Sequence, residues 1–125
     1  MEKHSKEKVF ITGISGFTGV YLEKYLVKKG FNVFGTSFKH SNNPNHFVCN
    51  IINLDELCGI INTIKPSYII HLAAISFVAT KDLENLYKIN IFGTLNLLEA
   101  LKNLKLKPKK IIIASTAAVY GNVEG

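Results

Sequence analysis

The sequence predicts an α/β fold in which alternating strands and helices build a doubly wound parallel sheet. Three observations indicate this class. Short apolar runs alternate with longer stretches of helical periodicity along the 125 residues. A glycine-rich turn follows the first apolar run and opens the first helical stretch. The late run at 110–115 contains IIIA, which suits a central parallel strand covered on both faces. Right-handed crossovers between such units predict the strand order 3-2-1-4-5.

Five strands and three helices are expected within a single domain. The strands are expected at 8–12, 31–36, 47–49, 67–72 and 110–115, and the helices at 17–29, 54–64 and 82–104. Asn53 is the expected N-cap of the second helix, because acidic residues follow it in the first turn and Pro66 lies beyond the helix end. The stretch 38–46 has the serine, asparagine and proline content of a loop.

Two of these helices carry apolar residues near helical spacing, which predicts their buried faces. The first has Val20, Tyr21, Tyr25 and Leu26, and the third has a stripe formed by Leu83, Leu86, Tyr87, Ile91, Leu95, Leu98 and Leu101. Gly93 interrupts the third helix. A glycine at this point indicates close packing against a neighbour rather than a break.

Composition limits the class of protein further. Hydrophobic residues make up 47% of the chain and charged residues 19%, and no apolar run reaches the roughly 18 residues that a membrane span requires. The charged amino-terminal segment lacks the apolar stretch of a secretory signal, so a cytoplasmic location is expected. Cys49 and Cys58 have neither disulfide-framework nor zinc-site spacing and are interpreted as buried thiols, and no metal is expected.

The formal charge of +6 comes entirely from lysine, because the chain contains no arginine. Arginine is the usual residue for bidentate contacts to phosphates and bases, so its absence argues against a nucleic-acid partner. The lysines gather near the two ends of the chain without interleaved aromatic residues. Solvated faces explain them better than a nucleic-acid interface does.

The glycine turn is the most informative local feature. Gly13, Gly16 and Gly19 are spaced by three and three residues, between the first expected strand and the first expected helix. Gly13 would permit the tight turn, Gly16 would let the backbone approach a pyrophosphate, and Gly19 would let the helix pack closely on the sheet. The helix N-terminus adds free N–H groups and the positive end of a dipole, so a dinucleotide site is predicted here.

The motif TGISGFTG at 12–19 resembles the TGxxGxxG turn of the extended short-chain dehydrogenases/reductases, the nucleotide-sugar epimerases, dehydratases and reductases. Three further motifs occur in the order of that family: HLAA at 71–74, NIFGTLNLLEA at 90–100 and STAAVYG at 115–121. Within the family, FITGISGF, HLAAISFV and NIFGTLNLLEALK are similar to the GDP-mannose 4,6-dehydratase and GDP-4-keto-6-deoxymannose reductase group. The resemblance covers nearly the whole chain and implies a Rossmann-like sheet, truncated before its sixth strand.

The resemblance also implies roles for individual residues. Cofactor contacts would come from Gly13, Ser15, Gly16, Phe17 and Gly19 at the pyrophosphate, from Leu72, Ala73 and Ala74 beside the riboses, and from Asn90 at the phosphates. Ser76 would face the substrate, and Thr116 would help to orient the reacting oxygen as a catalytic residue. The alternative for residues 72–74 is a packed strand end, and the alternative for Asn90 and Thr116 is a capping role. His71 is interpreted as a hydrogen-bonded core histidine.

Two departures from the family pattern concern the adenosine end of the cofactor. Members that bind NAD carry an acidic residue at the end of strand two, where this chain has Ser37. With Lys39 and His40 nearby, NADP is favoured over NAD by charge complementarity. Asn50 and Ile51 stand where the family has an aspartate and a hydrophobic residue against the adenine, and the Asn50 amide oxygen can still accept from the adenine amine.

The family's catalytic YxxxK pair is not found at its expected place after Thr116. Tyr25 and Lys29 have this spacing, but they lie on the first helix and are interpreted as structural. Residues 1–125 are therefore expected to be the incomplete dinucleotide-binding domain of such an enzyme, without its substrate domain and inactive alone. A nucleotide-sugar substrate and a homodimer would belong to the full-length enzyme. The alternatives are a non-catalytic NAD(P)-binding regulatory module and a structural domain in which the glycine turn is incidental.

Overall fold

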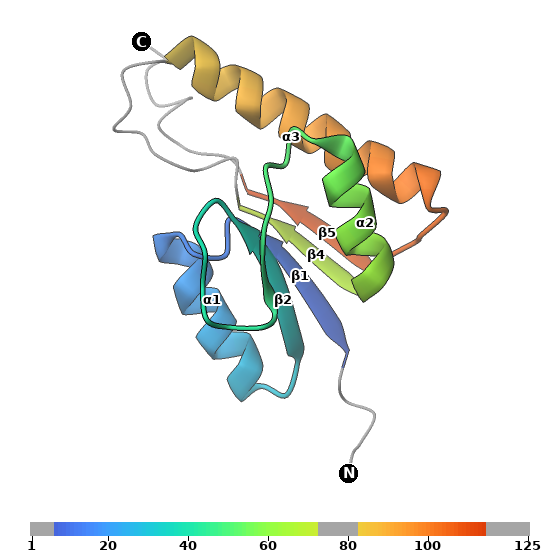
Figure 1. The fold of residues 1–125 in the computed structure, drawn as a ribbon. Coiled ribbons are helices and arrows are strands. Elements are labelled where there is room, and N and C mark those ends of the chain that lie inside the picture. The colour runs from blue at the N-terminus through green and yellow to red at the C-terminus, as the bar shows by residue number, and fades with distance from the viewer. Residues whose placement is uncertain (1–6, 73–82, 115–125) are drawn as a thin grey trace, which may run out of the picture.

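The computed structural model describes residues 7–72 and 83–114, although it does not place the side chains of 83–90 (Figure 1). Its elements follow the predicted order closely. They are β1 (Lys8–Thr12), α1 (Phe17–Lys28), β2 (Asn32–Ser37), β3 (His46–Val48), α2 (Leu54–Ile64), β4 (Tyr68–His71), α3 (Leu83–Asn103) and β5 (Lys110–Ile113). Predicted boundaries are correct to within two residues throughout.

The strands form a parallel sheet in the order β3-β2-β1-β4-β5, which confirms the predicted topology. Phe10 of β1 pairs with Phe34 of β2 and with Ile69 of β4. Ile69 pairs in turn with Ile111 of β5. Because all strands run in one direction, their carboxyl ends meet along one edge of the sheet. That edge carries Thr12, Ser37 and His71 at the ends of β1, β2 and β4.

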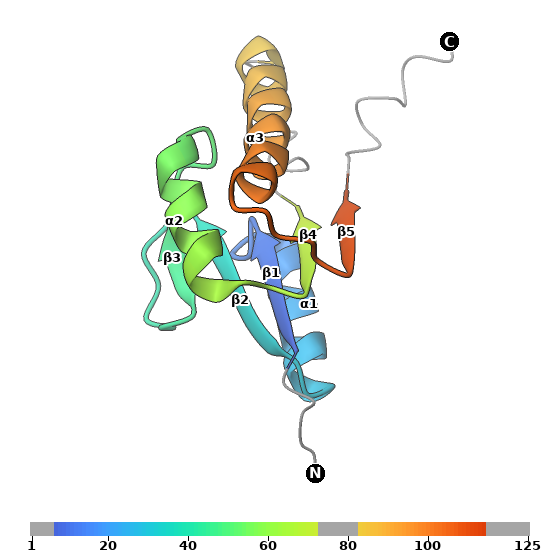
Figure 2. The same cartoon turned by 90° about the vertical axis from the view of Figure 1, so that its right-hand side faces the viewer.

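Helices cover both faces of the sheet, with α1 on one face and α2 and α3 on the other (Figure 2). The side chains of β1 alternate between these faces, as the two-residue period of a strand requires. Val9 and Ile11 pack with Leu22 and Leu26 of α1, whereas Phe10 packs with a second cluster. That second cluster draws its buried residues from both α2 and α3, and it includes Leu57, Ile61, Ile64, Leu97, Ala100 and Leu101.

The ends of α2 are formed as the sequence predicts. The Asn53 side chain accepts a hydrogen bond from the backbone N–H of Glu56, which satisfies one of the free donors at the helix start. At the other end, Lys65 adopts a left-handed conformation (φ 52°) and its N–H donates to the carbonyl of Ile61. Pro66 follows and cannot continue the helix.

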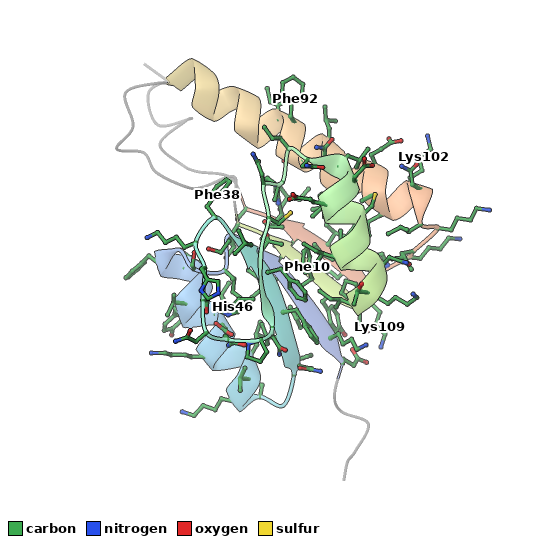
Figure 3. All side chains as sticks on the ribbon, viewed as in Figure 1. Phe10, Phe38, His46, Phe92, Lys102 and Lys109 are labelled. Carbon is green, nitrogen blue, oxygen red and sulfur yellow. The ribbon has the colours of Figure 1, made fainter. Side chains whose placement is uncertain are left out.

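The predicted buried faces of α1 and α3 are wrong in part. On α1, Val20, Tyr21 and Tyr25 are 42–69% exposed. Leu26 packs against the sheet as predicted, together with Gly19 and Leu22. On α3, the stripe residues Ile91, Leu95 and Leu98 are 43–55% exposed, as is Phe92, which points away from the sheet (Figure 3). Small residues determine which face of each helix is buried. Gly19 on α1, and Gly93 and Ala100 on α3, let the helix backbone approach its neighbours most closely on the face that carries them.

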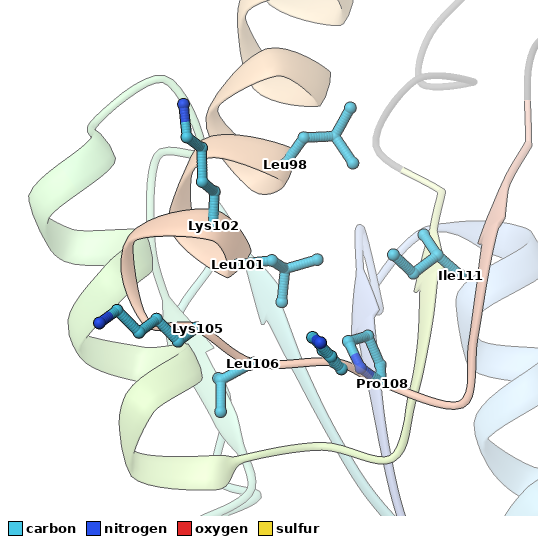
Figure 4. Close-up of a pocket in the computed structure, with 8 residues that line it drawn as sticks. Leu98, Leu101, Lys102, Lys105, Leu106, Pro108 and Ile111 are labelled. Atoms are coloured by element: carbon cyan, nitrogen blue, oxygen red, sulfur yellow. The ribbon is translucent and has the colours of Figure 1, made fainter.

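The expectation that the last strand is covered on both faces is also wrong. Ile111, Ile112 and Ile113 are 36–49% exposed, because β5 lies at the edge of the sheet in the described part of the chain. A shallow groove runs between β5 and the carboxyl end of α3 (Figure 4). Its apolar lining is Leu98, Leu101, Leu106, Pro108 and Ile111, and Lys102, Lys105 and Lys107 flank it. The groove adjoins the segment that leads into β5, away from the carboxyl edge of the sheet.

None of the helices in the described ranges has the length and hydropathy needed to cross a bilayer.

Candidate functional site

The glycine turn between β1 and α1 is held by the neighbouring strand. Gly13 has a φ of 74°, a conformation that favours glycine. The N–H groups of Gly13 and Ile14 both donate to the carbonyl oxygen of Thr36 on β2, each at 3.0 Å. The turn closes with a hydrogen bond from the Gly16 N–H to the Gly13 carbonyl at 3.1 Å. The start of α1 is therefore fixed at the carboxyl edge of the sheet.

The three glycines differ in what their surroundings allow. A Cβ atom on Gly19 would lie 2.5–2.7 Å from backbone atoms of Gly13 and Ile14, so only glycine fits there. A Cβ atom on Gly16 would meet only the Gly13 carbonyl oxygen, at an ordinary contact distance of 3.4 Å, and its φ of −73° suits any residue. The fold therefore does not require a glycine at position 16. Because the residue is glycine, the space that a side chain would fill is open to a ligand.

The first turn of α1 is suited to an anion. Backbone N–H groups in the first turn of an α-helix have no partner within the helix, and Gly16 provides no side-chain cap. The first turn contains no acidic residue that would repel an anion. Phe17, which opens the helix, is 94% exposed. Backbone donors and the helix dipole thus converge where the resemblance predicts a pyrophosphate.

A pair of serines links this turn to the end of β2. The hydroxyl oxygens of Ser15 and Ser37 are 2.6 Å apart, and Ser37 Oγ also accepts a hydrogen bond from the backbone N–H of Lys39 at 2.9 Å. Ser37 is buried and Lys39 and His40 are exposed. The structure therefore brings Ser15, Ser37 and the Lys39 backbone together beside the glycine turn.

The connection that carries Lys39 is anchored on α1. His46 Nε2 lies 2.9 and 3.0 Å from the two carboxylate oxygens of Glu23, and the Asn43 side chain donates to the same carboxylate at 3.2 Å. Figure 3 shows Phe38 and His46 near the two ends of this connection. The side-chain amide of Asn45 donates to the carbonyl of Val33 at 3.0 Å. These contacts fix the segment beside the serine pair.

The predicted adenine segment directly follows β3, the strand that pairs with β2. Asn50 is exposed, and its side-chain oxygen accepts a hydrogen bond from the Ile52 N–H at 3.1 Å. Ile51 is only 3% exposed, so its side chain is part of the packed interior. Cys49, the residue before Asn50, is buried as predicted, and burial raises the pKa of its thiol to about 11. The same prediction for Cys58 is wrong, because Cys58 is only partly buried.

His71 is a core histidine, as predicted. It is fully buried, its Nδ1 lies 2.7 Å from the Thr12 hydroxyl and its Nε2 lies 3.1 Å from the Thr94 hydroxyl. Burial lowers the pKa of His71 to about 4, so the ring is neutral at physiological pH. Leu72, which follows, is 5% exposed and donates its N–H to the Thr12 carbonyl.

Some predicted site residues are outside the described part of the chain. Ala73, Ala74, Ser76 and Thr116 are among them, and for Asn90 only the helical backbone is described. Tyr25 and Lys29, the pair with YxxxK spacing, lie at the far end of α1, where the Lys29 ammonium stands 5.4 Å from the Tyr25 ring centroid. This cation–π contact agrees with their structural interpretation.

Sequence reasoning missed three contributors. The Thr36 carbonyl holds the glycine turn, but any residue supplies a carbonyl, so no side-chain signal marks it. Thr94 and Asn96 reach His71 and Ile51 from α3. Both polar residues stand among leucines in the motif GTLNLL, and that contrast is the signal that could have found them.

This fold and glycine turn define the class of Rossmann-like α/β domains, and comparisons with known proteins narrow the class. The profile of the GDP-mannose 4,6 dehydratase family matches residues 10–125. GDP-6-deoxy-D-talose 4-dehydrogenase from Aggregatibacter actinomycetemcomitans is 32% identical over 117 residues, which cover 91% of this chain and 37% of that protein. The chain belongs to the extended short-chain dehydrogenase/reductase family of nucleotide-sugar epimerases and dehydratases, in its GDP-mannose 4,6-dehydratase branch.

Solved structures agree with this assignment. UDP-glucose 4-epimerase from Brucella ovis in complex with NAD superposes with a TM-score of 0.77 at 26% identity, over 92% of this chain and 37% of that one. UDP-glucose 4-epimerase from Thermotoga maritima, solved with UDP-glucose, gives 0.75 at 28% identity, over 88% and 38%. The chain thus spans less than two fifths of the length of the relatives it matches.

Proposed function

We propose that this chain is the dinucleotide-binding part of an NAD(P)-dependent nucleotide-sugar epimerase, dehydratase or reductase. The observation that carries the proposal is the turn from Gly13 to Gly19. The turn places the uncapped start of α1 at the carboxyl edge of the sheet. The fold would tolerate a side chain at position 16, but the residue there is glycine. When bound, the dinucleotide would accept or return a hydride at a sugar carbon.

A glycine substitution separates ligand binding from folding. Gly16→Ala should fold normally, because the added Cβ has an ordinary contact, but its methyl group would occupy the space above the turn. We expect its affinity for NADPH and NADH to fall at least tenfold, which is about 1.4 kcal/mol. Gly59→Ala on α2 is the matched control, since no atom lies within 4 Å of the added Cβ.

Titration calorimetry and the fluorescence of the reduced dinucleotides measure this binding, and circular dichroism checks that each variant is folded. If the folded wild type binds neither dinucleotide up to millimolar concentration, the proposal is wrong. The same holds if Gly16→Ala binds as tightly as Gly59→Ala.

We further propose that NADP is preferred over NAD. Ser37 places a hydroxyl where an acid would repel a 2′-phosphate, and Lys39 adds a positive charge two residues later. Ser37→Asp should therefore weaken NADP⁺ binding and strengthen NAD⁺ binding. Ser41→Asp adds the same charge further along the connection and should change the ratio of the two affinities less. Equal ratios for the two variants would refute the preference.

The reaction of the whole protein is part of the proposal. Relatives act on GDP-, UDP- and dTDP-linked sugars by their names, which supports a nucleotide-sugar substrate. Ser76 would face that substrate and Thr116 would orient its reacting oxygen. Without a YxxxK pair after Thr116, the 125 residues alone should show binding but no turnover, and turnover by the isolated chain would refute this. A cytoplasmic location stays a prediction.

The alternative is a non-catalytic NAD(P)-binding regulatory module, which would use the same turn from Gly13 to Gly19 to bind the dinucleotide without turnover. The coding sequence beyond Gly125 separates the two functions. A YxxxK motif within about thirty residues favours the enzyme, and a stop codon favours the module.

We also infer that α3 takes part in a homodimer of the full-length protein. Ile91, Phe92, Leu95 and Leu98 expose an apolar surface along this helix. Light scattering after size-exclusion chromatography would show a mass of two chains, and Leu95→Lys should reduce it to one.

A further inference from the structure

One turn of α3, from Gly93 to Asn96, contacts Ile51 in the predicted adenine segment. A Cβ atom on Gly93 would overlap the end of the Ile51 side chain, so the glycine makes room for it. Asn96 lies at the other end of this turn, and its side-chain amide donates to the Ile51 carbonyl at 3.1 Å. Helix α3 therefore holds both the side chain and the backbone of the same residue.

The same turn also holds the end of β4. The Thr94 hydroxyl lies 3.1 Å from Nε2 of His71, whose Nδ1 lies 2.7 Å from the hydroxyl of Thr12. Thr12 is the residue before the glycine turn, and His71 is the residue before Leu72. Because His71 is fully buried and neutral, it joins α3, β4 and β1 without placing a charge beneath the site.

We propose that Gly93, Thr94 and Asn96 are positioning residues that set the dinucleotide affinity of this chain from beneath the site. The proposal rests on the proposed function. Three segments predicted to line the cofactor, at Gly13, Ile51 and Leu72, are joined through this single turn. A binding surface that is held in its bound geometry does not have to be ordered by the ligand, so loosening these ties should weaken binding.

The test measures affinity and thermal stability together. The probe is whichever of NADP⁺ and NAD⁺ the wild type binds more tightly. Asn96→Leu removes the amide donor at similar size, and Gly93→Ala displaces Ile51. Each should raise the dissociation constant about tenfold. Thr94→Val removes the hydroxyl and should weaken binding, whereas Thr94→Ser keeps the hydroxyl and should restore it.

Two controls separate positioning from general stability. Gly59→Ala introduces the same methyl group at an open helical position. Ile61→Val thins the core cluster around α2 without removing any of these ties, and should lower the melting temperature without changing the dissociation constant.

Each outcome is decisive. A folded wild type that binds neither dinucleotide overturns the proposed function and this inference with it. If the wild type binds but Asn96→Leu and Gly93→Ala bind within twofold of it, only this inference is overturned. It is also overturned if Ile61→Val weakens binding as much as Asn96→Leu does at an equal loss of melting temperature.

Discussion

Acidification should destabilise this fold through His71. The residue is fully buried, and its pKa falls from an ordinary 6.5 to about 4 because burial disfavours the charged ring. The unfolded chain therefore binds a proton between pH 6.5 and pH 4 that the folded chain does not. The stability due to the neutral ring is complete above pH 6.5 and is lost as the pH falls towards 4. For these two pKa values, the loss between pH 7 and pH 5 is about 2 kcal/mol.

Urea denaturation followed by circular dichroism, at pH 7 and pH 5, measures this loss. His71→Gln keeps hydrogen-bonding capacity but does not titrate, so its loss over the same range should be smaller by about 2 kcal/mol. The comparison cancels the carboxylates and the other histidines, which both proteins share. If the two proteins lose equal stability, burial does not depress this pKa. An NMR titration of the His71 ring in the wild type, which needs no folded variant, should give a value well below 6.

Further predictions concern the turn, a helix cap and the thiols. Gly19→Ala forces a Cβ against backbone atoms at 2.5–2.7 Å and should cost about 1–3 kcal/mol in urea denaturation, whereas a loss below about 0.5 kcal/mol would contradict the close packing. Asn53→Ala removes the acceptor of the Glu56 N–H and should lower the free energy of unfolding by about 1 kcal/mol in the same assay. An unchanged free energy of unfolding would contradict this. Burial raises the pKa of Cys49 to about 11, so a thiol reagent at pH 8 should label the partly exposed Cys58 first; faster labelling of Cys49 would contradict this order.

The topology was predictable from the sequence because local signals and the chirality of strand connections suffice for it. The turn at Gly13, the N-cap at Asn53 and the apolar strand runs each act within a few residues. Right-handed crossovers then leave few orders for the strands. The buried helix faces were harder to predict, because the spacing of apolar residues does not show which face of the helix a small residue brings close to the sheet. On α1 this misled the interpretation of Tyr21, which is 69% exposed.

The candidate site was predictable only where the type of a residue is enough to indicate its role. The glycines of the turn are such cases, since backbone conformation can be inferred from residue type, whereas the role of Ser37 at the cofactor stays a prediction. The polar ties from α3 were not predictable, because Asn96 and Ile51 are 45 positions apart and only the packed helix brings them together. Ile51 is 3% exposed, and its place against the adenine stays a prediction.

The exposed isoleucines of β5 have a consequence for handling this chain in solution. Within residues 7–72 and 83–114, β5 is an edge strand with isoleucines that are 36–49% exposed, and such a strand is a template for cross-β self-association. Lys107 and Lys110 precede these isoleucines, and their charges are expected to oppose such self-association, whereas Lys109 is paired with Glu7. Their repulsion is screened by salt. The isolated chain should therefore remain clear in low-salt buffer and become turbid as ionic strength rises.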